Sequence, residues 1–231
     1  MKKVLFILLF IFLLPVVCFS GEYRLLEGKK EDVCKAYLKN LNSFRNWPLM
    51  ACERSFNEHI PYLKGIDWQP TWTRDVNENK TTILNKDAWD KILTFVDPDN
   101  YPRRGKYDFL GYSIRKAEID IDNDGVLETI YRPEISLCKS SHYYATYIVV
   151  FDENKNDINI SKTKKLLGSA IHDTGISNGV MFDAFTYKGK TYFDMWDDRG
   201  FEKDPKTLTV YLFKDNQIQK KCVYQHRNKS K

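Results

Sequence analysis

Motifs that would assign a chemistry are absent from this chain of 231 residues. It has no C-x-x-C pair, which argues against a thioredoxin-like redox site and a zinc ribbon. It also has no G-x-S-x-G, H-E-x-x-H, P-loop or dinucleotide glycine motif, so no serine nucleophile, zincin site or nucleotide cofactor is predicted. No repeat of blade length occurs, which argues against a full propeller. The formal net charge is only +5, too small for a nucleic-acid interface.

An apolar run long enough to span a bilayer is also lacking, although a shorter one stands at the N-terminus. Two lysines precede 16 mostly apolar residues, 4–19, which are broken by Pro15. A transmembrane helix needs roughly 20 such residues. The pattern, followed by the small residue Ser20, predicts a secretory signal peptide over residues 1–20. We therefore predict a periplasmic or secreted protein with no transmembrane segment after cleavage; an uncleaved anchor and lipidation at Cys18 are the alternatives.

Removal of the signal peptide would leave four cysteines and a net charge of +3. An even number of cysteines in an exported chain predicts two disulfides. Three connectivities are open. We favour Cys34–Cys52 with Cys138–Cys222, because the first pair closes a short loop and the second would tie two C-terminal strands together.

The first half of the mature chain shows helical periodicity in two places. Residues 31–42 carry apolar side chains at helical spacing, and a second helix is expected from Asn85, which suits an N-cap. Residues 21–29 are interpreted as a short leader. Residues 46–74 contain prolines and tryptophans, and we interpret them as an ordered coil over the core.

From Tyr107 onward the apolar periodicity changes to two. Residues 181–187 and 191–196 predict one hairpin, and residues 208–213 and 218–224 predict another. The chain is therefore predicted to be α+β, with N-terminal helices packed on a C-terminal antiparallel β-meander. The expected division is a signal peptide 1–20, a helical and irregular part 21–105 and an antiparallel β part 106–231, the last two forming one domain.

The strongest chemical signal is the acidic loop, residues 120–128. Calcium prefers six to eight hard oxygen ligands, and alternating carboxylates in a tight turn converge on one point. Without a cation, clustered carboxylates repel one another. The predicted calcium ligands are the side chains of Asp120, Asp122, Asp124 and Glu128 with the main-chain carbonyl of Val126, and Gly125 allows the bend.

The acidic loop departs from an EF-hand, because position 12 is Tyr131 and both flanks alternate like strands. With its acid at position 9, it instead resembles the cation loop of FG-GAP and VCBS-type repeats, D-x-D-x-D-G-x-x-D. The resemblance implies a calcium-loop hairpin; Glu128 in the last place and the single copy are departures. An acidic turn without an ion is the alternative. Residues 33–38 and 187–192 also resemble uncharacterised exported bacterial proteins, a likeness that implies no activity.

No catalytic residue is assigned from the sequence. Asp173-Thr174-Gly175 matches the aspartic-protease tripeptide, but one copy would require a homodimer, and a loop turn explains it better. We predict a calcium-stabilised, disulfide-bonded binding or structural module of the cell envelope in preference to an enzyme. Its expected partner is a protein or an anionic glycan and not a nucleic acid. The alternatives are an envelope hydrolase that uses acids and His172, and an inhibitor of a secreted enzyme with a contact surface over residues 47–72.

Overall fold

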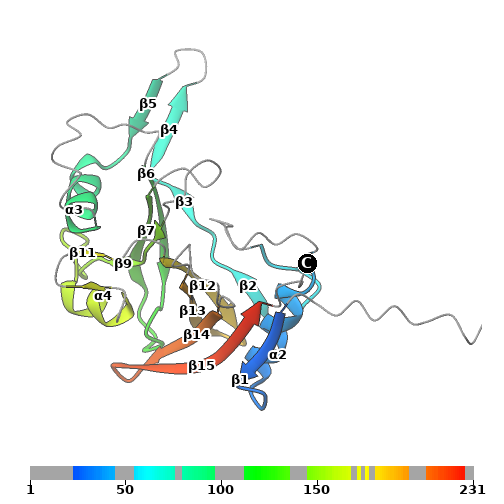
Figure 1. Cartoon of the computed structure of the whole chain (residues 1–231). Helices are drawn as coiled ribbons and strands as arrows, with labels where there is room; N and C mark the ends of the chain where they lie inside the picture. The colour runs from blue at the N-terminus through cyan, green and yellow to red at the C-terminus, as the bar shows by residue number, and fades with distance from the viewer. Residues whose placement is uncertain are drawn as a thin grey trace, which may run out of the picture.

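The structure of the protein is a computed structural model. Figure 1 shows how its helices and strands are arranged. The residues described are 23–44, 55–75, 80–96, 112–135, 145–167, 171–172, 175–176, 180–197 and 207–226. Most of them lie in strands, and the largest assembly is an 11-stranded sheet. No helix among these residues is long and apolar enough to cross a membrane.

The large sheet has the main-path order β1-β15-β14-β13-β12-β8-β7-β6-β3, with β2 paired to β12 and β9 paired to β7. Two further two-stranded sheets are formed by β4 with β5 and by β10 with β11. The strands are β1 (Tyr23–Glu27), β2 (Leu63–Gly65), β3 (Gln69–Pro70), β4 (Trp72–Asp75), β5 (Lys80–Ile83), β6 (Tyr112–Ile119), β7 (Glu128–Ile135), β8 (Ala145–Thr146), β9 (Val149–Val150), β10 (Ile171–His172), β11 (Gly175–Ile176), β12 (Val180–Tyr187), β13 (Lys190–Asp197), β14 (Thr207–Lys214) and β15 (Gln217–His226).

The two hairpins predicted near the C-terminus are confirmed. Strands β12 and β13 pair through Tyr187 and Lys190, and β14 and β15 pair through Lys214 and Gln217. Both residues of each two-residue turn have positive φ, at Lys188-Gly189 and at Asp215-Asn216. Turns with two positive φ values match the right-handed twist of the flanking strands, which explains these tight connections.

Three helices lie among the described residues: α2 (Asp32–Leu41), α3 (Lys86–Val96) and α4 (Ile160–Leu167). The first two confirm the predicted helices. The side chain of Asn85 accepts a hydrogen bond from the amide of Ala88 at 3.0 Å, as an N-cap does. Asn159 caps α4 in the same way through the amide of Lys162, at 2.9 Å. In Figure 1, α3 and α4 lie beside β6, β7 and β9, whereas α2 lies beside β1 and β15.

Strands β12, β13 and β14 carry buried side chains on both faces. On β12, Phe182 and Ala184 join a hydrophobic cluster shared with α3, α4, β6 and β7, whereas Phe185 joins a second cluster shared with α2, β1 and β15. Burial on both faces removes more apolar surface from water than burial on one, and each buried Phe contributes about 1.5–3 kcal/mol. The meander is therefore the common wall of two cores.

The predicted fold class is wrong, because strands and helices are not divided between the two halves of the chain. Strands β1 and β2, from the part predicted as leader and coil, pair with β15 and β12 of the meander. Helix α4 interrupts the part predicted as β. A strand contributed from a distance forms only by pairing with the sheet, so short segments such as Leu63–Gly65 carry no periodicity that reveals them.

The preferred disulfide pairing is also wrong. Cys34 on α2 is bonded to Cys222 on β15, across 188 residues of sequence, with the two Cα atoms 5.6 Å apart. Both cysteines are fully buried in the second cluster. The bond fixes α2 to the sheet. The shorter loop was not decisive because the pairing of β1 with β15 brings α2 beside β15. Cys52 and Cys138 lie outside the described residues.

Candidate functional site

The acidic loop joins two adjacent antiparallel strands. Strand β6 ends at Ile119 and β7 begins at Glu128, and these two residues pair directly. The expected strand on each side of the loop is therefore present. The turn depends on two residues with positive φ, Asn123 at 58° and Gly125 at 94°. An added Cβ at Gly125 would meet nothing within 4 Å, so it is the backbone conformation that favours glycine there.

Three of the predicted ligands are brought together. One ligand oxygen from each of Asp120, Asp122 and Asp124 lies within 4.8 Å of the others. Asp120 accepts hydrogen bonds from the amides of Asp124 and Gly125, both at 3.0 Å. These bonds hold the turn and aim its carboxylates at one place. Val126 is more than half exposed, so it is not part of either hydrophobic core.

Asn123, which the sequence analysis did not single out, anchors the loop to the meander. Its amide nitrogen donates to the carbonyls of Thr191, at 3.0 Å, and Phe213, at 2.9 Å. Its side-chain oxygen accepts from the amide of Thr191 at 2.8 Å. Because the side chain reaches both β13 and β14, the middle of the acidic loop is held by neutral contacts. The only local signal was an asparagine in a turn, which also suits an Asx turn.

Lys162 of α4 is the second residue that sequence reasoning missed. Its Nζ lies 2.6 Å from Asp122 Oδ2 and 2.5 Å from Glu128 Oε1. Among the described residues, no other ion pair is made with the acidic loop. Burial disfavours the charge on Lys162, but hydrogen bonds to Asp122 and Glu128 outweigh it and raise the pKa of this ammonium. Lys162 thus partly fills the role that a metal cation was expected to fill.

One lysine does not balance the loop. Burial raises the pKa of Glu128, and repulsion from Asp122 adds to this effect despite the hydrogen bonds from Lys162 and the amide of Ile121. Oδ1 of Asp122 is buried and, among the described residues, has no hydrogen-bond partner. A buried polar atom without a partner is rare and calls for a ligand, an ion or a water. The region retains negative charge and one unused buried oxygen.

A second charged site, found only in the structure, lies at the seam between the meander and the β6–β7 hairpin. Here the sheet is held by the two-residue strand β8, where Thr146 pairs with both Met181 and Glu134. The segment from β2 to β3 crosses the same seam, because β2 pairs with β12 and β3 with β6. The main-chain pairing across the seam is therefore short, and side chains add to it.

Those side chains form the seam cluster, which consists of Trp68, Arg132, Glu134 and Asp183. Arg132 is 1% exposed and donates to Asp183 Oδ2 and to Glu134 Oε1, each at 2.8 Å. Trp68 Nε1 donates to Asp183 Oδ1 at 2.9 Å, and the guanidinium of Arg132 lies 5.0 Å from the centre of the Trp68 ring. Charges buried in this way are tolerated because each has a partner.

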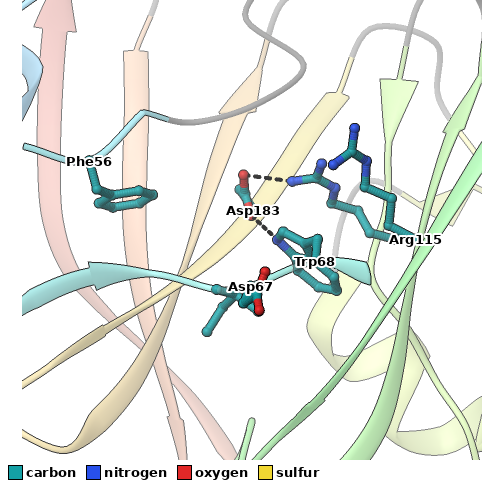
Figure 2. A pocket seen from close by; sticks show the side chains of 7 residues that line it. Phe56, Asp67, Trp68, Arg115 and Asp183 are labelled. Carbon is teal, nitrogen blue, oxygen red and sulfur yellow. Dashed lines mark hydrogen bonds and ion pairs between the residues drawn. The ribbon is translucent and has the colours of Figure 1, made fainter. Parts of the chain in front are cut away.

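A cavity of about 190 Å³ opens beside this cluster and is called the seam pocket. Figure 2 shows Phe56 across the pocket from Trp68 and Arg115, with Asp183 between them. An added Cβ at Gly65 would lie 2.5 Å from Cδ2 of Phe56, so glycine is required for this ring to pack against the strand. The lining residues are Phe56, Ile66, Asp67, Trp68, Arg115, Arg132 and Asp183.

Other residues weighed from the sequence are placed in part. His172 ends β10, while Asp173 lies outside the described residues, so the hydrolase hypothesis stays a prediction. Asp194 is fully buried and accepts a hydrogen bond from the hydroxyl of Tyr37. It therefore belongs to the second core.

Comparison of the chain with protein-family models, with curated proteins and with solved structures gives no match. The acidic loop and the seam pocket are the two features of the described residues that bear on function.

Proposed function

We propose that this chain is a non-enzymatic, exported binding module of the cell envelope, whose acidic loop binds calcium. The observation that carries the metal proposal is the convergence of Asp120, Asp122 and Asp124, whose ligand oxygens lie within 4.8 Å of one another. The unpartnered, buried Oδ1 of Asp122 supports it independently. Calcium would be held by these three carboxylates with the Val126 carbonyl and Glu128, and would neutralise their mutual repulsion.

Calcium fits this set of donors better than other common cations. All five donors are hard oxygen atoms, which suit calcium and magnesium rather than zinc or copper. Calcium accepts six to eight ligands in irregular geometry, whereas magnesium requires a near-ideal octahedron. The turn keeps Asp120 bonded to two backbone amides, which limits how its ligands can be arranged. Such a turn suits calcium, which accepts irregular geometry, better than magnesium.

Lys162 sets the expected strength of binding. Its ammonium contacts both Asp122 and Glu128, so calcium must compete with it for two of the five donors. The anchoring by Asn123 acts in the opposite sense, because a loop already held in place loses less conformational entropy on binding. We expect a dissociation constant on the order of 10⁻⁴ to 10⁻³ M, as in extracellular modules.

Export is supported by the Cys34–Cys222 disulfide, because such bonds persist in oxidising compartments and are rare in the cytosol. The signal peptide predicted over residues 1–20 agrees with this location. The proposed partner is a protein or an anionic glycan of the envelope, and the low net charge makes nucleic acid a poor candidate. The immobilised mature chain is used to capture its partner from envelope extract, with and without protease treatment of the extract. Capture that is lost after protease treatment indicates a protein, and capture that persists indicates a glycan.

The calcium proposal is tested by thermal unfolding of the mature chain, residues 21–231, in calcium, in magnesium and in chelator. At about 10 mM calcium and a dissociation constant of about 0.5 mM, linkage predicts about 2 kcal/mol of stabilisation, or roughly 5 °C. Asp122→Ala should abolish the difference. Glu27→Gln is the matched control, because it removes one carboxylate from an exposed ion pair with Lys220, away from the loop. Identical melts in calcium and chelator, with no calorimetric heat, would overturn the proposal.

A further inference from the structure

Arg132, which lines the seam pocket, carries a buried hydrogen-bond donor that has no acceptor among the described residues. Nε of Arg132 has no hydrogen-bond partner among the described residues, although the other two nitrogens of the guanidinium donate to Asp183 and Glu134. The Arg132 side chain is 99% buried, since its exposed fraction is 1%, and it lines the pocket. A buried N–H without an acceptor costs free energy, so an acceptor supplied from outside would be favoured.

The carboxylates of Asp183 and Glu134 are already paired with Arg132. Both oxygens of Asp183 accept hydrogen bonds, Oδ1 from Trp68 and the amide of Ala184 and Oδ2 from Arg132. Glu134 Oε1 accepts from Arg132 and lies 3.9 Å from Nε of Arg115. Arg115 lines the same pocket with its side chain 31% exposed. A guanidinium has five N–H donors and no acceptor. Two guanidinium groups at one pocket, those of Arg132 and Arg115, therefore favour a ligand rich in acceptors.

Three features narrow the class of ligand. A carboxylate matches the planar fork of a guanidinium and forms charge-assisted hydrogen bonds with it. A doubly charged phosphate would face the carboxylates of Asp67, Asp183 and Glu134, which lie in or beside the pocket. A sugar would need an open aromatic face, but Trp68 is only 9% exposed and Arg132 lies over its ring. A singly charged carboxylate matches the guanidinium, carries less negative charge than phosphate, and needs no open aromatic face.

The size of the cavity limits the ligand further. A volume of about 190 Å³ is below the 300–1,000 Å³ of pockets for drug-sized molecules. We propose that the seam pocket binds a small monocarboxylate of the size of propionate or alanine, recognised by Arg132 and Arg115. Asp67, exposed at the pocket, is placed to distinguish a plain carboxylate from an α-amino acid, because its carboxylate would attract an ammonium group.

The test observes the unsatisfied donor directly. In the ¹⁵N-labelled mature chain, the Nε–H resonance of Arg132 is identified by its loss in Arg132→Lys, and is followed during titration with sodium propionate, L-alanine, propionamide or inorganic phosphate. We expect a saturable shift with propionate or alanine, with a dissociation constant on the order of 1 mM for so few ligand atoms. Propionamide should bind at least about tenfold more weakly, because it lacks the charge.

Variants on one strand provide matched controls. Arg115→Gln should weaken propionate binding about tenfold, and Arg115→Lys, which retains the charge without the planar fork, should weaken it severalfold. Lys116→Gln removes the same charge from the next residue of β6, where the lysine pairs with Glu118, and should change binding less than about twofold. Thermal unfolding of each variant shows whether it remains folded.

The outcomes are distinct. Tighter binding of alanine than of propionate, lost in Asp67→Asn, identifies an amino acid, and equal binding identifies a plain carboxylate. No saturable shift with either probe, equal binding of propionamide, tighter binding of phosphate or an unchanged affinity in Arg115→Gln would each overturn the proposal. Because the titration is done in chelator and read at Arg132, its result does not depend on calcium binding at the acidic loop.

Discussion

The acidic loop and the seam cluster are both rich in charge, but they are built in opposite ways. The loop takes its carboxylates from nine consecutive residues, 120–128, and holds Asp124 exposed to solvent. The seam cluster takes its members from β7, β12 and the segment before β3, and buries Arg132 and Asp183 almost completely. Negative charge is in surplus in the first and is paired in the second. We therefore expect the cluster to be needed for folding and the loop to be free to respond to ions.

The largest effect is expected from Arg132→Met. This variant leaves the carboxylate of Asp183, 4% exposed, without its cation, and it removes the ion pair that joins β7 to β12. Breaking a buried pair by removing one partner costs about 3–5 kcal/mol. The free energy of unfolding should fall by that amount in a urea titration. Arg24→Met, at an exposed pair with Gln225, is the control and should cost under about 1 kcal/mol. A loss below about 1 kcal/mol for Arg132→Met would show that the seam is held by other contacts.

The same difference in construction decides how much of each region could be predicted from the sequence. The acidic loop was found from the sequence because its three aspartates alternate within five positions. The hairpins at Lys188-Gly189 and Asp215-Asn216 were found because alternation and turn residues are local. Arg132 and Asp183 are 51 residues apart, and Trp68 and Asp183 are 115 apart, so no local pattern relates them. The Cys34–Cys222 bond was missed for the same reason.

A smaller but substantial effect is expected from Asn123→Ala, which tests whether the loop is held by neutral contacts. The substitution removes three hydrogen bonds to Thr191 and Phe213 and leaves the amide of Thr191 without its acceptor. We expect a loss of about 2–3 kcal/mol in the free energy of unfolding, measured in chelator. Asn216→Ala, in the exposed turn between β14 and β15, is the comparison and should cost less. An equal, small loss in both variants would mean that the acidic residues themselves shape the loop.

Lys162→Met should act on the loop in two directions. In chelator, Asp122 and Glu128 lose their shared cation, and stability should fall by about 1–2 kcal/mol because their side chains are only 12% and 10% exposed. In calcium, the competitor for these two carboxylates is gone, and the affinity measured by calorimetry should rise about tenfold. Lys164→Met changes an exposed lysine of the same helix and should alter neither quantity. Weaker calcium binding in Lys162→Met would instead assign the lysine a supporting role.

The smallest effect on stability, and the sharpest separation of the two regions, is expected from Asp124→Asn. The amide oxygen can still accept the hydrogen bond from the amide of Val126, at 2.8 Å in the native loop, so the turn is retained. The variant removes one charge from a cluster that already repels itself, and the free energy of unfolding in chelator should change by less than about 0.5 kcal/mol. Calcium affinity should nevertheless fall several-fold, because a neutral amide is a weaker ligand for the ion than a carboxylate.

Asp183→Asn is the corresponding change in the seam cluster. Its amide can still accept from Trp68, but the lost charge leaves Arg132 poorly compensated, so stability should fall even though no ion is involved. If both substitutions proved equally costly in chelator, the acidic loop would be a structural element like the cluster, and its carboxylates would not be reserved for a cation.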